Sequence, residues 1–386
     1  MNLDIDFVRA QFPAFSEPGL HGQAFFENAG GSYACKPVID RLTRFYHARK
    51  VQPYAPYAAS KAGGEEMDDA RQRLAAMLNV DTDELSFGPS TTQNTYVLSQ
   101  AVRGWLEPGE AIIVTNQDHE ANSGPWRRLA DAGIEVREWQ IDPETGHLDP
   151  AKLDTLLADG KVRLLCFPHC SNVVGEINDV AAICQTARRA GAFTVVDGVS
   201  YAPHGLPDVT KLGPDVYLFS AYKTYGPHQG IMIIRHTFGK ILPNQAHYFN
   251  GDVLYKRFTP AGPDHAQIAA SAGMADYIDT LFAHHAKGLD ATPQVRASAV
   301  HDLMRAHEIK LLQPLLDYVA AKNSLRLIGP SDATKRAPTV ALALATPGLE
   351  AATSLAKHGI MCGGGDFYAV RPLEAMNVDP NLGVLR

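Results

Sequence analysis

The 386-residue sequence lacks any long apolar run. No stretch reaches the roughly 20 apolar residues that a membrane-spanning helix needs, and the start, MNLDIDFVRAQFPAF, mixes acidic with apolar residues at helical spacing. Long blocks of one charge sign are absent too, and the formal net charge is a mild -7. We therefore expect a cytoplasmic protein that binds neither membranes nor nucleic acids.

Cysteine is also scarce. The odd number of cysteines, few for this length, suits reduced thiols better than a disulfide framework. The five are Cys35, Cys166, Cys170, Cys184 and Cys362. Cys166 and Cys170 form a C-x-x-x-C pattern, but no second pair of ligands accompanies it, so we expect core packing and no metal site.

What the sequence does contain is an alternation of two periodicities. Between about residues 64 and 235, short β-rich runs such as AIIVT, VRLLCF and FTVVD alternate with amphipathic helical stretches. Most of these runs are apolar throughout, which is typical of a parallel sheet covered on both faces. The pattern predicts an α/β fold whose mainly parallel sheet is flanked by helices. After FTPAGPDHAQ, long helical stretches replace the alternation of short β-rich runs and helices, which indicates a smaller α+β domain near the C-terminus.

Two of the predicted strands are followed by groups of opposite charge. Asp197 ends FTVVD, and Lys223 lies in SAYKTYGPHQG, directly after the next strand. Because ligands of such sheets bind at the carboxyl ends of the strands, we expect both side chains beside one ligand. A carboxylate is costly to bury unless a cation meets it, and a lysine held there can act as a nucleophile.

Three further strand ends suit a phosphorylated aromatic ligand. SFGPSTTQNT is a strand, a turn and a helix start at Thr91 and Thr92, whose N–H groups and hydroxyls can bind phosphate. His119 and Asn172 follow two other strands. We therefore predict pyridoxal 5'-phosphate (PLP) as cofactor, with a Lys223 Schiff base, with Asp197 keeping the pyridine nitrogen protonated, and with His119 on the ring face. Helix capping alone is the alternative for His119 and for the two threonines.

At these residues the sequence resembles the class V aminotransferase family of PLP enzymes, and within it the cysteine desulfurase/selenocysteine lyase-like branch. The matching motifs occur in family order over roughly residues 20 to 235; they are FFENAGGS, GPSTT, DHEAN, SNVVGEI, VVDGVSYAPH and SAYKTYGPHQG. The resemblance implies PLP fold type I with a seven-stranded sheet, a small amino-acid substrate, and a homodimer with active sites at the subunit interface. The domains expected are residues 1–20 packing on the small domain, 21–260 for the large PLP-binding domain, and 261–386 for the small one.

The resemblance also implies roles for single residues. The catalytic set is Lys223, His119 and Asp197, and Asn172 lies near the ring's 3-hydroxyl and the substrate. The remaining implied cofactor contacts are Thr91, Thr92, Ser200, Ser220 and Tyr222, and those to substrate are Asn28, Asn172 and Arg386. Arg386 matches an arginine that grips the substrate carboxylate. Relatives continue through another strand and helix, so the chain is either short or cut off here, and we expect Arg386 to be poorly held.

The sequence departs from the family in the loop GGGDFYAVRPL. Tyr368 stands where desulfurases carry the cysteine that accepts sulfur, and a tyrosine cannot hold a persulfide. Cys362 is an alternative acceptor only if the loop is flexible. Tyr222 replaces a common histidine and Ser200 a common glutamine, which changes the proton-transfer surroundings of the lysine. Gly262 replaces a threonine that reaches the partner's phosphate.

Three residues outside this set each have two possible roles. His204 and His228 either line the pocket or hydrogen-bond to loops, and Arg371 is expected in a surface helix rather than at a substrate carboxylate.

Three functions remain open. The first is a PLP-dependent enzyme acting on a small amino acid, by β-elimination or by a desulfurase-like reaction. The second is an aminotransferase or epimerase of the same fold. The third is a non-catalytic binding module, against which the presence of both Lys223 and Asp197 argues.

Overall fold

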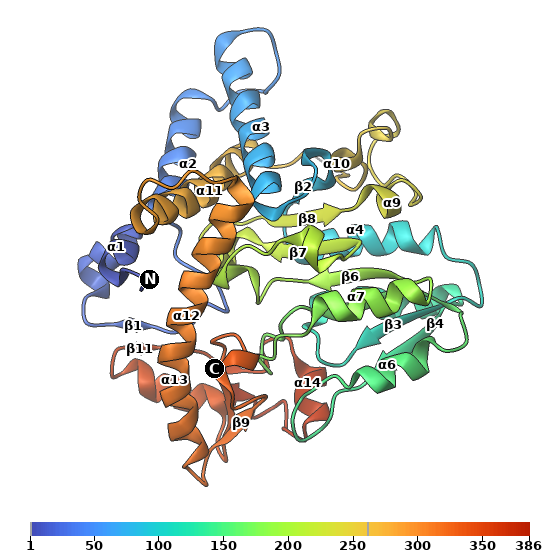
Figure 1. The fold of residues 1–386 in the computed structure, drawn as a ribbon, viewed down its shortest axis with the longest axis vertical. Coiled ribbons are helices and arrows are strands. Elements are labelled where there is room, and N and C mark those ends of the chain that lie inside the picture. The colour runs from blue at the N-terminus through green and yellow to red at the C-terminus, as the bar shows by residue number, and fades with distance from the viewer. Residues whose placement is uncertain (1, 261) are drawn as a thin grey trace.

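The structure is a computed structural model that describes residues 2–260 and 262–386. A seven-stranded sheet with the order β2-β8-β7-β6-β5-β3-β4 lies at its centre (Figure 1). Its strands are β2 (Leu85–Gly88), β3 (Ala111–Thr115), β4 (Glu135–Trp139), β5 (Val162–Pro168), β6 (Phe193–Asp197), β7 (Val216–Ser220) and β8 (Gly230–Ile234). Strand β8 runs antiparallel to its two neighbours, β2 and β7, and the other neighbouring pairs of this sheet are parallel. The predicted mainly parallel, seven-stranded α/β sheet is therefore confirmed.

Two hydrophobic cores cover the two faces of this sheet, because successive side chains of a strand point to opposite faces. On one face Leu165 and Phe167 pack with residues of α3, α7 and α11, and on the other Leu164 and Cys166 pack with residues of α4. The helices of the first face are α3 (Ala58–Leu78), α6 (Pro150–Leu157), α7 (Val180–Arg189), α8 (Val209–Leu212) and α11 (His265–His285). Those of the second are α4 (Thr91–Arg103), α5 (Gly124–Arg127), α9 (His236–Gly239) and α10 (Leu254–Arg257).

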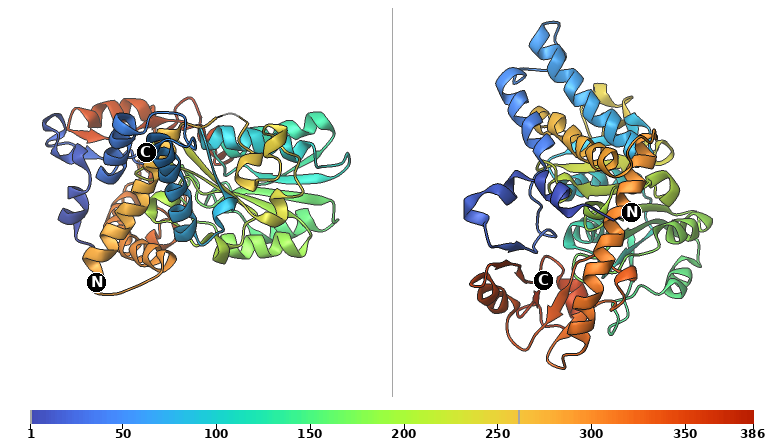
Figure 2. Two further views of the ribbon diagram at one scale, coloured as in Figure 1. Left: turned by 90° about the horizontal axis from the view of Figure 1, so that it is seen from above. Right: turned by 60° about the vertical axis from the view of Figure 1, so that its left-hand side comes forward.

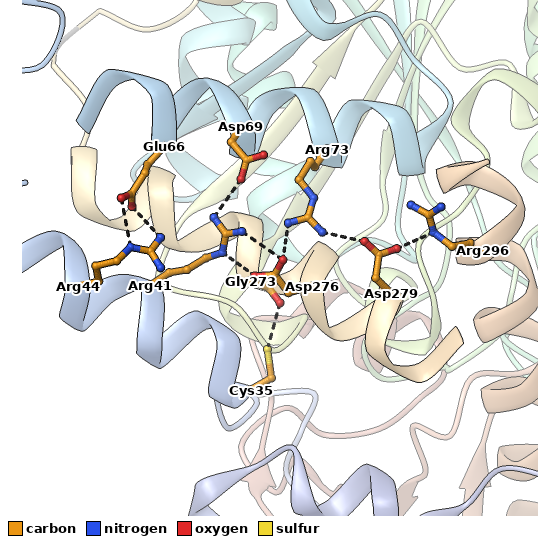
Figure 3. A network of polar contacts seen from close by, with 10 residues as sticks. All are labelled: Cys35, Arg41, Arg44, Glu66, Asp69, Arg73, Gly273, Asp276, Asp279 and Arg296. Atoms are coloured by element: carbon orange, nitrogen blue, oxygen red, sulfur yellow. Dashed lines mark hydrogen bonds and ion pairs between the residues drawn. The ribbon is translucent and has the colours of Figure 1, made fainter. Parts of the chain in front are cut away.

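Helix α11 packs closely on α2 (Lys36–Ala48) and on α3. A Cβ atom at Gly273 would lie 2.4 Å from the backbone nitrogen of Val38, so the approach of α11 to α2 requires a glycine there. A chain of ion pairs joins α2, α3, α11 and α12 (Pro293–Ala320), with Asp276 at its centre (Figure 3). None of the helices among the described residues is both long and apolar enough to cross a membrane.

The N-terminal segment lies against the end of α11. Asp4, which caps α1 (Ile5–Ala10), accepts a hydrogen bond from His284, and Phe7 stacks on the same histidine with ring centroids 3.7 Å apart. Farther along, β1 (Ala24–Phe25) pairs in parallel with β11 (Ile360–Met361), so the segment also meets the C-terminal part of the chain (Figure 2).

The C-terminal part forms a four-stranded sheet with the order β12-β13-β10-β9, and α12 runs from α3 down to it (Figure 1). The elements here are β9 (Arg326–Ile328), β10 (Ala341–Ala343), β12 (Gly364–Gly365), β13 (Val384–Leu385), α13 (Gly348–Ala356) and α14 (Val370–Ala375). The expected domain boundary falls at residue 261, which lies outside the described residues. Because α11 packs on α2 and α3, the division into residues 21–260 and 261–386 stays a prediction.

Candidate active site

Polar side chains gather in one pocket at the carboxyl ends of the central strands. This inner pocket is lined by Thr91, Thr92, His119, Ala121, Pro168, Cys170, Asn172, Asp197, Val199, Ser200, Ser220, Tyr222 and Lys223. Asp197 is the last residue of β6, and Lys223 ends a single 3-10 turn that follows the neighbouring strand β7. The strand ends that the sequence singled out are thus brought together.

Lys223 and Asp197 are both buried, and burial shifts both pKa values. Burial lowers the pKa of Lys223 to about 8, and the charge of Arg386 adds to this effect, while Asp197 and Glu27 oppose it. Burial raises the pKa of Asp197 to about 6. The N–H of Val199 donates to Asp197 Oδ1 at 2.8 Å, and this hydrogen bond lowers the pKa in part. A lysine with such a pKa has an appreciable share of neutral, nucleophilic amine near neutral pH.

The start of α4 forms an anion site beside them. Ser90 caps the helix by accepting from the N–H of Gln93 at 3.1 Å, and the hydroxyls of Thr91 and Ser220 lie 2.8 Å apart. A Cβ atom at Gly230 would lie 2.4 Å from the nitrogen of Thr91, so a glycine in β8 lets the helix start approach the sheet. Backbone N–H groups and hydroxyls arranged in this way bind phosphate.

His119 lies on the wall of the inner pocket as a neutral ring. Its Nδ1 accepts a hydrogen bond from the N–H of Ala121 at 3.0 Å, so a single ring proton belongs on Nε2. Burial, followed by the charges of Lys223 and Arg386, lowers the pKa of His119 to about 4. The side chain therefore caps the turn that follows it and also faces the pocket, so the two roles weighed from the sequence are compatible.

A wider outer pocket opens from the inner one. It shares six residues with the inner pocket and adds Glu27, Ala29, Gly30, Tyr96, Glu120, Phe367, Tyr368 and Arg386. Asn172 lies between the two; its Nδ2 donates to the carbonyl of Phe367 at 3.0 Å, and its Oδ1 is buried without a partner among the described residues.

Arg386 is firmly placed, so the expectation that it is poorly held is wrong. Its backbone exchanges two hydrogen bonds with Gly363, and only 5% of its side chain is exposed. The guanidinium lies 3.7 Å from the ring centroid of Phe367 and bonds to Glu27 Oε1 at 2.5 Å. The antiparallel pairing of β13 with β12 provides this support.

These features accompany a match to a known family. The class V aminotransferase model matches residues 24–377. The chain belongs to this family. Members of the class V aminotransferase family are PLP-dependent enzymes, so the predicted family and cofactor are confirmed.

Relatives support the desulfurase-like branch, and solved structures support the fold. An aminotransferase-like protein of Gibberella zeae is 34% identical over 349 residues, which span 88% of this chain and 81% of the relative. A cysteine desulfurase of Serratia proteamaculans is 30% identical over 325 residues, 79% of this chain and 78% of the relative. Cysteine desulfurases of Thermococcus onnurineus and Escherichia coli share the fold, with TM-scores of 0.82 and 0.80 at 21% and 23% identity; each match covers 100% of this chain and 92% and 93% of the other, respectively.

The inner pocket of this class V chain fits PLP. The amine of Lys223 can bind the aldehyde, the carboxylate of Asp197 can pair with a protonated pyridine nitrogen, and the start of α4 can hold the phosphate. The unpartnered Oδ1 of Asn172 needs a donor, which a ring hydroxyl can supply.

The other residues named from the sequence are scattered around this centre. Ser200 lines the inner pocket, and Tyr222 lines both pockets and stacks on His228 with ring centroids 4.8 Å apart. His204 instead pairs with Glu308 at 2.7 Å. Asn28 is half-buried and lines neither pocket, whereas its neighbour Glu27 lines the outer one.

Residues farther from the cofactor chemistry are placed as follows. Arg371 lies in α14 and pairs with Glu120 at 3.3 Å, and Gly262 borders a separate cavity beside Tyr255 and His265. Sequence reasoning missed Glu27 and Phe367. Glu27 lies inside the FFENAGGS motif, which was the available signal. The sequence alone does not show whether Glu27 or Asn28 faces the pocket.

The loop that carries Tyr368 is fixed over the outer pocket. Phe367 and Tyr368 both have left-handed backbones, with φ of 53° and 56°, a conformation that costs roughly 1–2 kcal/mol per non-glycine residue. The carbonyl of Tyr368 accepts from the N–H of Glu120 at 2.8 Å, and that of Phe367 accepts from Asn172. Cys362 lines neither pocket, and burial together with the charge of Glu27 raises the pKa of its thiol.

Proposed function

We propose that the protein is a PLP-dependent enzyme that acts on a small amino acid by a β-lyase type of reaction, with Lys223 binding the aldehyde of PLP. The observation that carries the proposal is the pair of Asp197 and Lys223 at the ends of neighbouring strands in one buried pocket. A binding module without chemistry has no use for a buried lysine whose pKa burial has lowered to about 8.

Each residue of the site has a part in this reaction. When bound, PLP withdraws electrons from the Cα of an attached amino acid and weakens the bonds at that carbon. Lys223 would take the proton from Cα, and Asp197 would keep the ring nitrogen protonated. His119, as a neutral ring, would cover the ring face, and Arg386 would orient the substrate through its carboxylate.

A persulfide-forming desulfurase reaction is disfavoured. Tyr368 carries no thiol, and its loop is held by hydrogen bonds rather than free to swing. The raised pKa of Cys362 makes it a poor nucleophile. An aminotransferase or epimerase reaction is the alternative, and the relative of Gibberella zeae, which is named aminotransferase-like, favours it.

We also propose a homodimer in a reducing, cytoplasmic compartment. Tyr248 and Phe249 are 91% and 67% exposed, which is typical of apolar side chains that a partner covers. All five cysteines are free, which suits reduced thiols.

The visible spectrum of the purified protein with PLP tests the central assignment. The wild type should show an imine-type absorption band that shifts on addition of an amino acid substrate, and Lys223→Ala should lack the band. Release of pyruvate and ammonia from a shifted sample would indicate a lyase, and amino transfer to an oxo acid would indicate the alternative. A band that survives in Lys223→Ala would contradict the role of Lys223, and no band in the wild type would favour the binding module.

A further inference from the structure

The guanidinium of Arg386 is already engaged by a carboxylate of its own chain. Nη2 bonds to Glu27 Oε1 at 2.5 Å, Nη1 donates to the carbonyl of Asn172 at 3.3 Å, and Nε has no partner among the described residues. A substrate carboxylate needs two neighbouring N–H groups for a bidentate grip. With Glu27 in place, only part of that grip is free.

The surroundings are shaped to hold Glu27 in this position. A Cβ atom at Gly30 would lie 2.6 Å from Glu27 Oε1, and one at Gly363 would lie 3.0 Å from Glu27 Oε2. Glycines on both sides therefore leave room for the carboxylate. Glu27 Oε2 is buried and has no hydrogen-bond partner among the described residues, although Glu27 lines the outer pocket. A buried carboxylate oxygen of this kind needs a hydrogen-bond donor. If the ion pair with Arg386 served stability alone, the fold would supply a donor to Oε2 as well.

The charges of the outer pocket indicate which donor fits. Glu27 and Glu120 are its two carboxylates, and Arg386 and Lys223 are its basic side chains besides the neutral ring of His119. Glu120 is exposed to solvent and pairs with Arg371, whereas Glu27 pairs with Arg386, the arginine proposed to orient the substrate carboxylate. A substrate whose only free charge is a carboxylate would be repelled by Glu27. A second ammonium on the substrate would instead pair with Glu27, and the aromatic side chains of Tyr96 and Tyr222, which line the same pocket, suit such a cation.

We propose that Glu27 is a specificity-determining residue that partly masks Arg386 and makes the site prefer amino acids with a cationic side chain over short neutral ones such as alanine and cysteine. This inference rests on the proposed function, because the α-amino group of the substrate is taken to be bound at the cofactor. Two measurements test the two parts separately.

The first measurement needs no cofactor. Propionate is titrated calorimetrically into the PLP-free wild type and into Glu27→Gln, which keeps the size of the side chain and removes its charge. Unmasking Arg386 should tighten propionate binding by about tenfold or more. Glu120→Gln removes the same charge from the same pocket and should change binding less than about twofold, because its carboxylate does not touch Arg386. Equal propionate affinities of wild type and Glu27→Gln would overturn the masking of Arg386.

The second measurement uses the PLP-loaded protein, once its absorption band is recorded. The affinity of each amino acid is read from the shift of that band, which needs no leaving group on the amino acid. The ratio of the Kd for L-alanine to the Kd for L-ornithine should favour ornithine in the wild type and fall by about tenfold or more in Glu27→Gln. Glu27→Asp, which keeps the charge, should retain the preference for ornithine. An unchanged ratio in Glu27→Gln, or a wild type that prefers alanine, would overturn the specificity role. A protein that forms no band but shows the propionate effect would refute the proposed function and support the masking of Arg386.

Discussion

Asp197 and Lys223 follow neighbouring strands, and burial moves their pKa values toward each other, to about 6 for the carboxyl and about 8 for the amine. Between these two pH values both groups are charged in the protein without cofactor. Burial makes each of the two charges costly. A site arranged in this way is destabilising until it meets a ligand that offers an aldehyde to the amine and a cationic nitrogen to the carboxylate, which is what PLP brings.

Asp197→Asn should therefore stabilise the PLP-free protein at high pH while it disables the enzyme. The folded pKa of Asp197 lies above the unfolded value of 3.8, so stability is lost as the pH rises from 3.8 through about 6. At pH 9 the carboxyl is ionised and Lys223 is largely neutral, so removing the charge should raise the free energy of unfolding by up to about 3 kcal/mol. Asn can still accept from Val199.

Denaturant unfolding of the two PLP-free proteins at pH 9 and below pH 4 measures this difference. The gain should be present at pH 9 and should fade below pH 4, where the wild-type carboxyl is protonated in both states. PLP-loaded Asp197→Asn should still show bound cofactor but turn over substrate far more slowly. A variant that is less stable than the wild type at pH 9 would contradict the burial cost assigned to this carboxylate.

Thr91→Val should weaken the binding of PLP through its phosphate. The change keeps the shape of the side chain and removes the hydroxyl that lies 2.8 Å from that of Ser220. Loss of one hydrogen bond to a charged group corresponds to about 1.5–3 kcal/mol, or about a tenfold or larger rise in Kd. Pyridoxal, which lacks the phosphate, is the control ligand, and its Kd should stay unchanged. Equal weakening for both ligands would place Thr91 away from the phosphate.

The sequence was sufficient for the sheet and for the polar groups at its edge. The strands are short apolar runs, and the carboxyl ends of parallel strands meet at one edge, so the sequence alone groups Asp197, Lys223 and Thr91. These contacts depend on local sequence and on one general property of parallel sheets.

The outer pocket could not be found in the same way. Glu27 and Arg386 are 359 positions apart, and they meet because β1 pairs with β11 while β13 pairs with β12. The strands involved have two residues each, too short for a periodicity to show which side chain faces the pocket. The choice of Asn28 over Glu27 and the expectation of a loose Arg386 both follow from this missing tertiary information.

Cysteine turnover should release free sulfide without leaving sulfur on the protein. Cys362 lies outside both pockets, and Tyr368, which is 73% exposed at the mouth, has no thiol. With cysteine at saturating concentration, Cys362→Ser should release sulfide at the wild-type rate, and intact-protein mass spectrometry should find no persulfide. Tyr368→Cys is the positive control, since it puts a thiol at the mouth. A wild-type persulfide that disappears in Cys362→Ser would show that Cys362 accepts sulfur.

Asp276→Asn should destabilise the helices behind the site without changing the site itself. Asp276 pairs with Arg41 at 2.5 Å and with Arg73, and the chain of pairs continues through Asp279 to Arg296 (Figure 3). Burial alone would raise the pKa of Asp276, but the hydrogen bonds from the two arginines outweigh it and lower that pKa below 3.8. The pair therefore stabilises the fold above the unfolded pKa, and this contribution is lost as the pH falls through the folded value.

At pH 7 the variant should lose about 2 kcal/mol of unfolding free energy, since a charge-assisted hydrogen bond contributes roughly 1.5–3 kcal/mol. Lys36 and Asp40 form an exposed pair on the outer side of α2, so Asp40→Asn is a matched control and should change stability by less than about 1 kcal/mol. The PLP absorption band of folded Asp276→Asn should match that of the wild type, because none of the ion-paired residues lines the inner pocket. Equal stabilities of the two variants would mean that the network contributes no more than a surface ion pair, and that the packing at Gly273 alone holds α11 in place.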